Sequence, residues 1–268
     1  MQTFPTHTLL PGDSPLIISV PHAGTAVPQE LAPRLTPMAL ALPDTDWHVT
    51  RLYDFAPDMG ATMLVARYSR YLIDLNRPPD DAALYSSAVQ TGLCPTQSFS
   101  GAPLYRDGAE QLKPAEIEQR REQYWRPYHE ALGTHIEHTR RRFGYALLLD
   151  AHSIRSTVPR LFAGRLPDVN VGTYDGRSCA REINETLRAR LATAASFSYV
   201  FDGRFKGGYI TRHYGQPDSA QHALQIELSQ SSYMDESDTS YDEKRAAALR
   251  ETLKGIVVSL LSLPMAAQ

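Results

Sequence analysis

Short apolar runs recur along the chain, and most are bounded by proline, glycine or polar residues. The first, LIISV at 16–20, lies between Pro15 and Pro21 and is rich in β-branched side chains. Runs of this length and composition are typical of strands buried in a sheet. The pattern predicts strands at 16–20, 61–67, 71–75, 145–152, 198–203 and 222–229.

Between these runs, the apolar positions follow helical spacing. In the longest such pattern, Pro114 suits the first turn, whereas Pro127 lies inside and should kink the helix or split it in two. Ser178 suits the N-cap of a later helix. Helices are predicted over about 44–57, 114–143, 178–191 and 243–261.

Strands that alternate with helices indicate an α/β fold with a mixed, mostly parallel sheet flanked by helices. The runs at 61–67 and 71–75 are too close for a parallel crossover, so we expect an antiparallel hairpin. Segment 77–112 is rich in Pro, Ser and Gly and predicts a long loop, a candidate cover for an active site. We predict a single domain over residues 1–268.

Composition narrows the possible partners. The chain has 27 basic and 30 acidic residues, a formal charge of −3, and no basic run that would suit nucleic acid. It shows neither a signal-peptide pattern nor the ~20 apolar residues that span a membrane. Cys94 and Cys179 lack the spacing of a disulfide framework or a cysteine zinc site. We therefore expect a cytoplasmic protein with neither a nucleic-acid nor a membrane partner, of unassigned oligomeric state.

Two predicted strands end in histidine. LIISV continues into PHAG and delivers His22, and YALLLDAH ends on His152. In open α/β sheets ligand sites gather at the carboxyl ends of strands, so both imidazoles are expected at one edge. Catalytic zinc sites often use two His, one carboxylate and an open position. PDTDWH offers Asp44 and Asp46 as that carboxylate, although either could be a helix N-cap, and each His could be a hydrogen-bonded loop residue.

HALQIELSQ places Glu227 among apolar neighbours in a predicted strand. Desolvation raises the pKa of a carboxyl group toward the range that suits a general base. A buried salt bridge is the alternative, and for an isolated residue it would come first. Beside a metal site, Glu227 becomes the leading candidate for activating a water molecule.

A third cluster suits an acidic substrate. YSRYLIDLNRP (68–78) contains Arg70, Asp74, Asn76 and Arg77, and FKGGYITRHYG adds Arg212 after a Gly-Gly turn. Arginine binds carboxylates through two parallel hydrogen bonds. The alternatives are a structural ion pair with a neighbouring aspartate and an ordinary hairpin turn at the glycines.

Seven motifs in order resemble the N-formylglutamate amidohydrolase family, and the resemblance covers most of the chain. No single motif decides it. The motifs are SVPHAG (19–24), DTDWHVTRLYDF (44–55), SRYLIDLNRP (69–78), LLLDAHSIRS (147–156), GTYDGRSC (172–179), KGGYITRHYG (206–215) and ALQIELS (223–229).

The resemblance implies a relation to the zinc carboxypeptidase and aspartoacylase (phosphorylase/hydrolase-like) fold. In that fold two His and one acidic residue hold zinc, a Glu acts as base, and an Asn-Arg pair with other arginines binds the substrate carboxylate. Applied to this sequence, the resemblance implies that His22 and His152 are metal ligands and that Glu227 is the base. It also implies that four residues face the substrate, namely Asn76, Arg77, Arg212 and Arg70.

One departure concerns the acidic ligand. Carboxypeptidases and aspartoacylases take two ligands from H-x-x-E, but the residue three after His22 is Thr25. We prefer Asp46 over Asp44, because the predicted helix would carry Asp46 on the same face as Tyr53 toward the sheet edge.

Two further aspartates are expected close to the ligands. Asp150 lies two residues before His152 in the predicted strand and is either a partner that orients a ligand or a rival ligand. Asp74 is expected to orient a ligand as well.

The resulting hypothesis is hydrolysis of N-formyl-L-glutamate to formate and L-glutamate, the last step of a histidine degradation route. It requires one divalent metal ion, with Zn²⁺ expected, although such sites also accept manganese, cobalt or iron. One alternative is a metal-dependent amidase or deacylase that acts on another N-acyl amino acid or a cell-wall peptide. The other is a non-catalytic binding protein for acidic metabolites.

Overall fold

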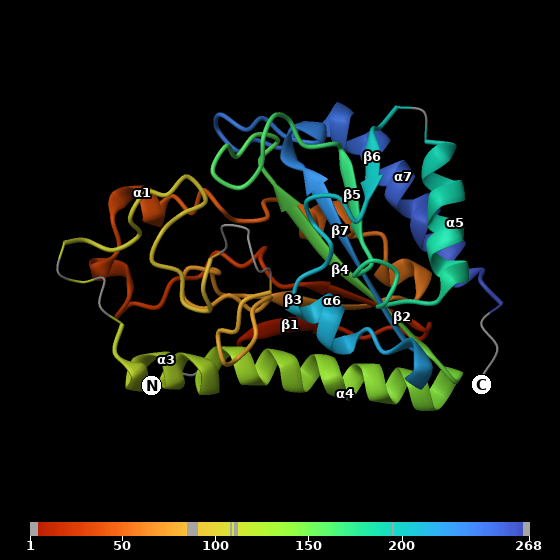
Figure 1. Ribbon diagram of the computed structural model, residues 1–268, viewed down its shortest axis with the longest axis horizontal. Coiled ribbons are helices and arrows are strands. Elements are labelled where there is room, and N and C mark those ends of the chain that lie inside the picture. The colour runs from red at the N-terminus through yellow and green to blue at the C-terminus, as the bar shows by residue number, and fades with distance from the viewer. Residues whose placement is uncertain (1–4, 85–90, 108, 110–111, 195, 265–268) are drawn as a thin grey trace.

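The computed structural model describes residues 5–84, 91–107, 109, 112–194 and 196–264 (Figure 1). Its centre is a seven-stranded sheet with the strand order β1-β3-β2-β4-β7-β5-β6. The strands are β1 (His7–Leu10), β2 (Leu16–Val20), β3 (Thr62–Ala66), β4 (Ala146–Ile154), β5 (Val169–Gly172), β6 (Tyr199–Phe201) and β7 (Gln221–Ser229).

Most neighbouring strands run in the same direction. The parallel pairs are β2–β3, β2–β4, β4–β7 and β5–β6. The antiparallel pairs are β1–β3 and β5–β7. The predicted α/β fold with a mixed, mostly parallel sheet is therefore confirmed.

Helices cover both faces of this sheet (Figure 1). The α-helices are α1 (Pro37–Leu40), α2 (Val49–Leu52), α3 (Pro114–Arg120), α4 (Arg126–Phe143), α5 (Arg181–Ala192), α6 (Tyr209–Tyr214) and α7 (Glu243–Leu261). A π-helical turn at Arg121–Trp125 joins α3 to α4, and short 3₁₀ turns lie at Ala32–Arg34, Pro57–Met59, Pro217–Ser219 and Gln230–Ser232.

The two faces hold two separate cores. Leu147 and Leu149 of β4 pack with side chains of α2, α5 and α7, whereas Leu148 packs with α4 and α6. Alternate residues of a strand point to opposite faces, which explains how one apolar run serves both layers. Burial on both faces is typical of a mainly parallel sheet and accounts for the unbroken LIISV and ALLL runs.

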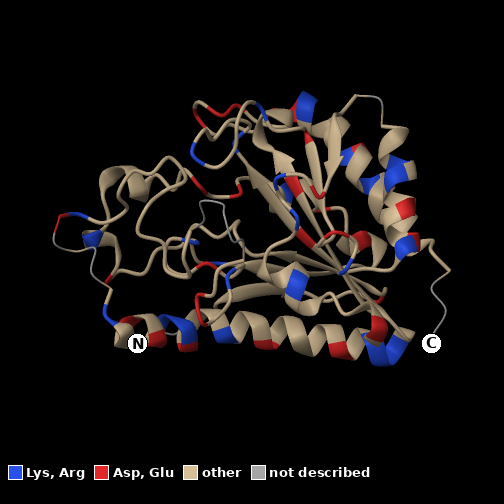
Figure 2. Cartoon of the chain, in the orientation of Figure 1, with Lys and Arg blue, Asp and Glu red and all other residues tan. Residues whose placement is uncertain are grey.

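Several predicted elements are confirmed. Strand 16–20 and helix 243–261 have the predicted bounds, and the Asp242 side chain caps that helix by accepting from the backbone N–H of Lys244 and Arg245. The long helical pattern runs without a break from α3 to α4, and the π-helical turn just before Pro127 interrupts the regular α-helix there rather than splitting it in two. Acidic and basic residues are interspersed along α4 and α5, as Figure 2 shows.

The predicted hairpin of 61–67 with 71–75 is wrong. Residues 71–75 form turns rather than a strand. Strand β3 already has β2 on one side and β1 on the other, so no edge remains for a second partner. Tyr71, Leu72 and Ile73 are nonetheless buried, because they pack beneath the sheet in the core that α4 shares.

Two predictions about helix starts also need correction. The helix expected over 44–57 is reduced to α2, because His48 takes the left-handed conformation with φ 63° and Pro57 starts a separate 3₁₀ turn. Ala180, and not Ser178, occupies the N-cap of α5. The Ser178 hydroxyl instead donates to the Ala223 carbonyl at 2.8 Å, which ties this segment to β7.

The described part of segment 77–112 contains no helix or strand, as predicted for a long loop. Residues 85–90, 108 and 110–111 of that segment lie outside the described residues. Among the helices that the structure describes, none is long and apolar enough to cross a membrane.

Candidate metal centre

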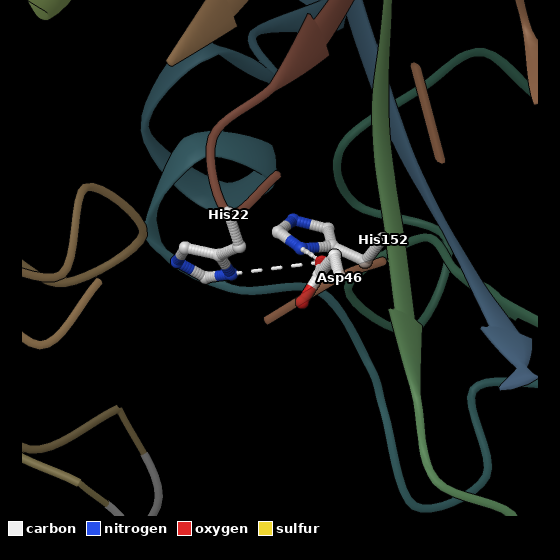
Figure 3. A group of neighbouring side chains, drawn as sticks. All are labelled: His22, Asp46 and His152. Carbon is white, nitrogen blue, oxygen red and sulfur yellow. Dashed lines mark hydrogen bonds and ion pairs between the residues drawn. The ribbon is translucent and has the colours of Figure 1, made fainter. Parts of the chain in front are cut away.

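Three buried side chains meet at the carboxyl ends of the central strands. His22 follows β2 by two residues, His152 belongs to β4, and Asp46 lies in the turn before α2 rather than in the predicted helix. Each side chain is at most 4% exposed. One potential ligand atom from each lies within 4.8 Å of the others, and Figure 3 shows the three side chains turned toward one another.

Both histidines present the same nitrogen to the aspartate. His152 Nδ1 is 3.0 Å from Asp46 Oδ2, and His22 Nδ1 is 3.8 Å from the same oxygen. Within the described part of the chain, His22 Nδ1 and Asp46 Oδ1 are buried without a hydrogen-bond partner. Unsatisfied buried polar atoms are costly and call for an ion or other partner. These two atoms therefore fit a divalent cation between the three side chains.

The opposite nitrogens are held by two further carboxylates. His22 Nε2 lies 2.7 Å from Asp74 Oδ1, and His152 Nε2 lies 2.9 Å from Asp150 Oδ2. A proton held at Nε2 leaves the lone pair at Nδ1, which is the form of imidazole that binds a metal. Burial alone would raise the pKa of Asp74, but Arg70 and His22 outweigh burial and hold that pKa well below its usual range.

The three acidic candidates occupy different positions. Asp46 groups with both Nδ1 atoms. Asp44 lies apart and accepts a hydrogen bond from the Phe99 backbone N–H at 2.7 Å. Asp150 contacts the far side of His152. The geometry thus favours Asp46 as the third ligand and Asp150 as a residue that orients His152.

Glu227 lies beside this cluster on the neighbouring strand. In the register of β4 and β7 it is paired with His152, and both line the same cavity. Burial raises the pKa of Glu227 to about 8. Its Oε2 accepts a hydrogen bond from Gln225 Nε2 at 3.1 Å. Among the described residues no basic nitrogen lies within 4.0 Å of Glu227, so the salt-bridge alternative finds no support.

The cavity also holds most of the residues predicted to face the substrate. Arg70, Asn76 and Arg77 all line it. Arg70 donates to Asp74 Oδ2 at 2.5 Å, and its guanidinium lies 4.6 Å from the Phe99 ring centroid. From the long segment 77–112, Leu84, Thr91 and Phe99 contribute to the wall, as expected of a cover.

The Asn76 amide has protein partners at both ends. Its Nδ2 donates to Asp150 Oδ2 at 3.0 Å and lies 2.9 Å from His152 Nε2. Its Oδ1 accepts from the Ile210 backbone N–H at 2.8 Å. These contacts explain the glycine at 208, because a Cβ there would come within 2.6 Å of the Asn76 amide.

Arg212 is not among the residues that line the cavity. Its Nε donates to the Gly207 carbonyl at 2.9 Å, and its Nη1 donates to the Leu84 carbonyl at 2.6 Å. Arg212 therefore supports the Gly207-Gly208 turn that precedes it in the sequence. Arg204, upstream of the same glycines, lines the cavity instead. Sequence reasoning missed it, although its place in FDGRFKGG just before the turn was an available signal.

Sequence comparisons match this chain to one family of known proteins. A model of the family described as N-formylglutamate amidohydrolase matches residues 14–234. Two curated relatives, both named N-formylglutamate deformylase, come from Pseudomonas putida and Pseudomonas aeruginosa PAO1. They are 49% and 50% identical over 254 residues, and each alignment covers 94% of both chains.

Solved structures share the fold. The crystal structure of N-formylglutamate amidohydrolase from Ralstonia eutropha JMP134 superposes with a TM-score of 0.82 and 25% identity, covering 96% of this chain and 98% of the other. A gene product of Agrobacterium tumefaciens gives a TM-score of 0.70 and 18% identity, with 96% and 97% covered. From the sequence matches and the family model, the chain belongs to the N-formylglutamate amidohydrolase family.

Proposed function

We propose that this protein hydrolyses N-formyl-L-glutamate to formate and L-glutamate, as the final step of a histidine degradation route in the cytoplasm. The observation that carries the proposal is the buried His22–Asp46–His152 cluster beside Glu227 in a cavity that also contains arginines. Half of the residues are identical to those of proteins named N-formylglutamate deformylase, which supports the choice of substrate.

The proposed cofactor is one divalent metal ion, most simply Zn²⁺, held by His22, Asp46 and His152. Two imidazoles and a carboxylate match the ligand set of catalytic zinc sites. When bound, such an ion supplies a Lewis acid that polarises a carbonyl and acidifies a water molecule. Asp74 and Asp150 hold the two imidazoles in the orientation that turns Nδ1 toward Asp46.

Glu227 acts as the general base and then as the general acid. Because Gln225 occupies Oε2, the other carboxylate oxygen is the one that takes a proton from the attacking water. The water oxygen bonds to the formyl carbon, the C–N bond breaks, and the Glu227 proton passes to the leaving nitrogen. The electron pair of the broken bond stays on that nitrogen, so the products are formate and the amine of L-glutamate.

The guanidinium of Arg77 binds a substrate carboxylate, and Arg70 supports the site from its ion pair with Asp74. Asn76 lines the same wall and fixes Asp150 and His152. Arg212, the other sequence-based candidate for this role, donates to the Gly207 and Leu84 carbonyls and so supports the loop that borders the cavity.

The test is formate release by purified protein, assayed with added Zn²⁺ and again after exhaustive chelation. We expect hydrolysis of N-formyl-L-glutamate in the first case, little in the second, and recovery when Zn²⁺ is restored. N-acetylglutamate, N-formylaspartate and a short cell-wall peptide serve as competing substrates. A faster rate on any of these, or full activity without metal, would contradict the proposal.

A further inference from the structure

The proposed substrate carries two carboxylates, and the described residues that line the cavity include three arginines. Arg70 pairs with Asp74 at 2.5 Å and lies 3.9 Å from Asp46, so its charge is balanced by acidic groups of the protein. Arg77 and Arg204 line the same cavity from other segments. Arg77 Nη2 donates to Thr91 Oγ1 at 3.2 Å and Arg204 Nε donates to the Leu161 carbonyl at 2.7 Å, so both side chains are held at the wall of the cavity.

We infer, on the basis of the proposed function, that Arg204 binds the γ-carboxylate of N-formylglutamate and so selects an acidic side chain. Arg77 then binds the α-carboxylate. A guanidinium binds a carboxylate through two parallel hydrogen bonds, and a site built for that contact discriminates strongly against a neutral side chain.

The neighbours of the two arginines indicate which of them binds which carboxylate. Arg77 directly follows Asn76, whose Nδ2 lies 2.9 Å from His152 Nε2. The charge of Arg77 also helps to lower the pKa of Asp74, whose carboxylate lies 2.7 Å from His22 Nε2, so Arg77 acts next to the metal centre. The α-carboxylate is one bond from the carbon that bears the reacting amide, and it needs the nearer arginine. Arg204 is held on another wall, where its Nε donates to the Leu161 carbonyl at 2.7 Å.

The wall around Arg204 suits the rest of a glutamate side chain. Leu161 and Phe205 line the cavity together with Arg204, and both belong to an apolar cluster with Ile154. Two methylene groups can lie against these apolar side chains while the terminal carboxylate meets the guanidinium. Pockets that combine apolar walls with a few placed polar groups are typical of small-molecule sites.

The segment that carries Arg204 is fixed at both ends. The Asp202 carboxylate accepts from Thr173 N at 2.7 Å and from Thr173 Oγ1 at 2.6 Å. At the other end, the Gly208 N–H donates to Gln225 Oε1 at 2.8 Å. With its Nε also engaged, Arg204 loses little conformational freedom when a ligand binds, which favours affinity. The same Gln225 contacts Glu227, so the specificity segment and the base share one support.

The experiment compares N-formyl-L-glutamate with N-formyl-L-glutamine, in which a neutral amide of the same shape replaces the γ-carboxylate. Zinc-loaded wild-type protein should prefer formylglutamate. For Arg204→Met, kcat/KM for formylglutamate should fall by about 30-fold or more, the scale of a hydrogen bond to a charged group. The value for formylglutamine should change by less than about 3-fold, so the preference collapses.

Arg142→Met is the matched control, since it removes an exposed guanidinium at the end of α4 and should leave the preference intact. Arg204→Gln carries the same expectation as Arg204→Met and retains an amide that can contact Leu161, in case the methionine variant does not fold. Zinc content and the thermal midpoint of each variant establish that the protein is intact.

Two results would overturn the inference: equal losses on both substrates, or an unchanged preference in both Arg204 variants. Failure of the wild-type protein to hydrolyse formylglutamate would instead contradict the proposed function, so the two failures are distinguishable.

Discussion

Asp46 and Asp44 are two residues apart, yet their carboxylates contact different groups. Asp46 faces both imidazole Nδ1 atoms, whereas Asp44 accepts from the Phe99 backbone. We predict that Asp46→Asn weakens Zn²⁺ binding by more than the roughly 10–100-fold typical of outer partners, because it removes a charged ligand. Titration against a competing chelator measures this. Asp44→Asn is the control and should retain wild-type affinity; equal affinities of the two variants would contradict the ligand assignment.

A substitution of Glu227 should affect catalysis without affecting metal binding. Glu227→Gln keeps the shape of the side chain and removes the group that accepts the proton. We predict that Zn²⁺ content stays at the wild-type level while kcat falls by about 10²–10⁴-fold. Glu185→Gln, which alters an exposed acid of α5 that pairs with Arg181, should change neither quantity. A Glu227→Gln protein with near-normal kcat would exclude Glu227 as the base.

At the scale of secondary-structure elements, the sequence predicted the elements whose bounds are set by neighbouring residues. LIISV and the α7 pattern carry their own boundaries in proline and in the Asp242 cap. The site residues His22, His152 and Glu227 could be found because β2, β4 and β7 are neighbours whose carboxyl ends converge. Residues 71–75 were assigned wrongly, since only the pairing of distant β1 with β3 shows that no edge was available.

Short and irregular segments could not be predicted from the sequence either, because distant parts of the chain hold them in place. Strand β5 has four residues, and it is held by β6 and β7, which lie far along the chain. Arg204 and Arg212 flank the same glycines, and only the path of the turn decides which one reaches the cavity. Contacts of this kind depend on tertiary packing and leave no periodic signal.

Helix α4 is tied to the irregular segment 71–76 through a buried histidine. His129 Nε2 lies 2.9 Å from the Leu75 carbonyl, and its ring stacks on Trp125 with centroids 3.8 Å apart. Burial lowers the pKa of His129 from 6.5 to about 3. The unfolded chain therefore binds this proton first, and the stabilisation that is present above pH 6.5 is lost as the pH falls toward 3.

We predict that this one histidine makes the free energy of unfolding about 2 kcal/mol smaller at pH 5 than at pH 7. His129→Gln, which can still donate to Leu75, should remove that share of the pH dependence. Urea unfolding at the two pH values measures it. His138→Gln on the exposed face of α4 is the control and should keep the wild-type slope. A His129→Gln slope equal to that of the wild type would contradict the assignment.

At the scale of the whole molecule, the candidate site draws on segments from one end of the chain to the other. His22, Asp46, His152 and Glu227 are separated by long stretches of sequence, and the sheet that unites them runs from residue 7 to residue 229. The two cores on its faces share the same central strands. This arrangement supports the prediction of a single domain over residues 1–268, which a single cooperative unfolding transition would confirm.

Removal of the metal should therefore lower the thermal stability of the whole fold as well as the rate of the reaction. A ligand that binds only the folded state stabilises it by about 4 kcal/mol at 1,000 times its Kd. For a chain of this size we expect Tm to rise by about 10 °C between chelated and Zn²⁺-saturated protein.

Scanning calorimetry over a series of buffered free Zn²⁺ concentrations measures that rise. Asp46→Asn should show a much smaller one over the same series, because its site lacks the carboxylate. A wild-type Tm that stays constant across three decades of free Zn²⁺ would mean that His22 Nδ1 and Asp46 Oδ1 are buried without a metal partner, and the proposed centre would have to be abandoned.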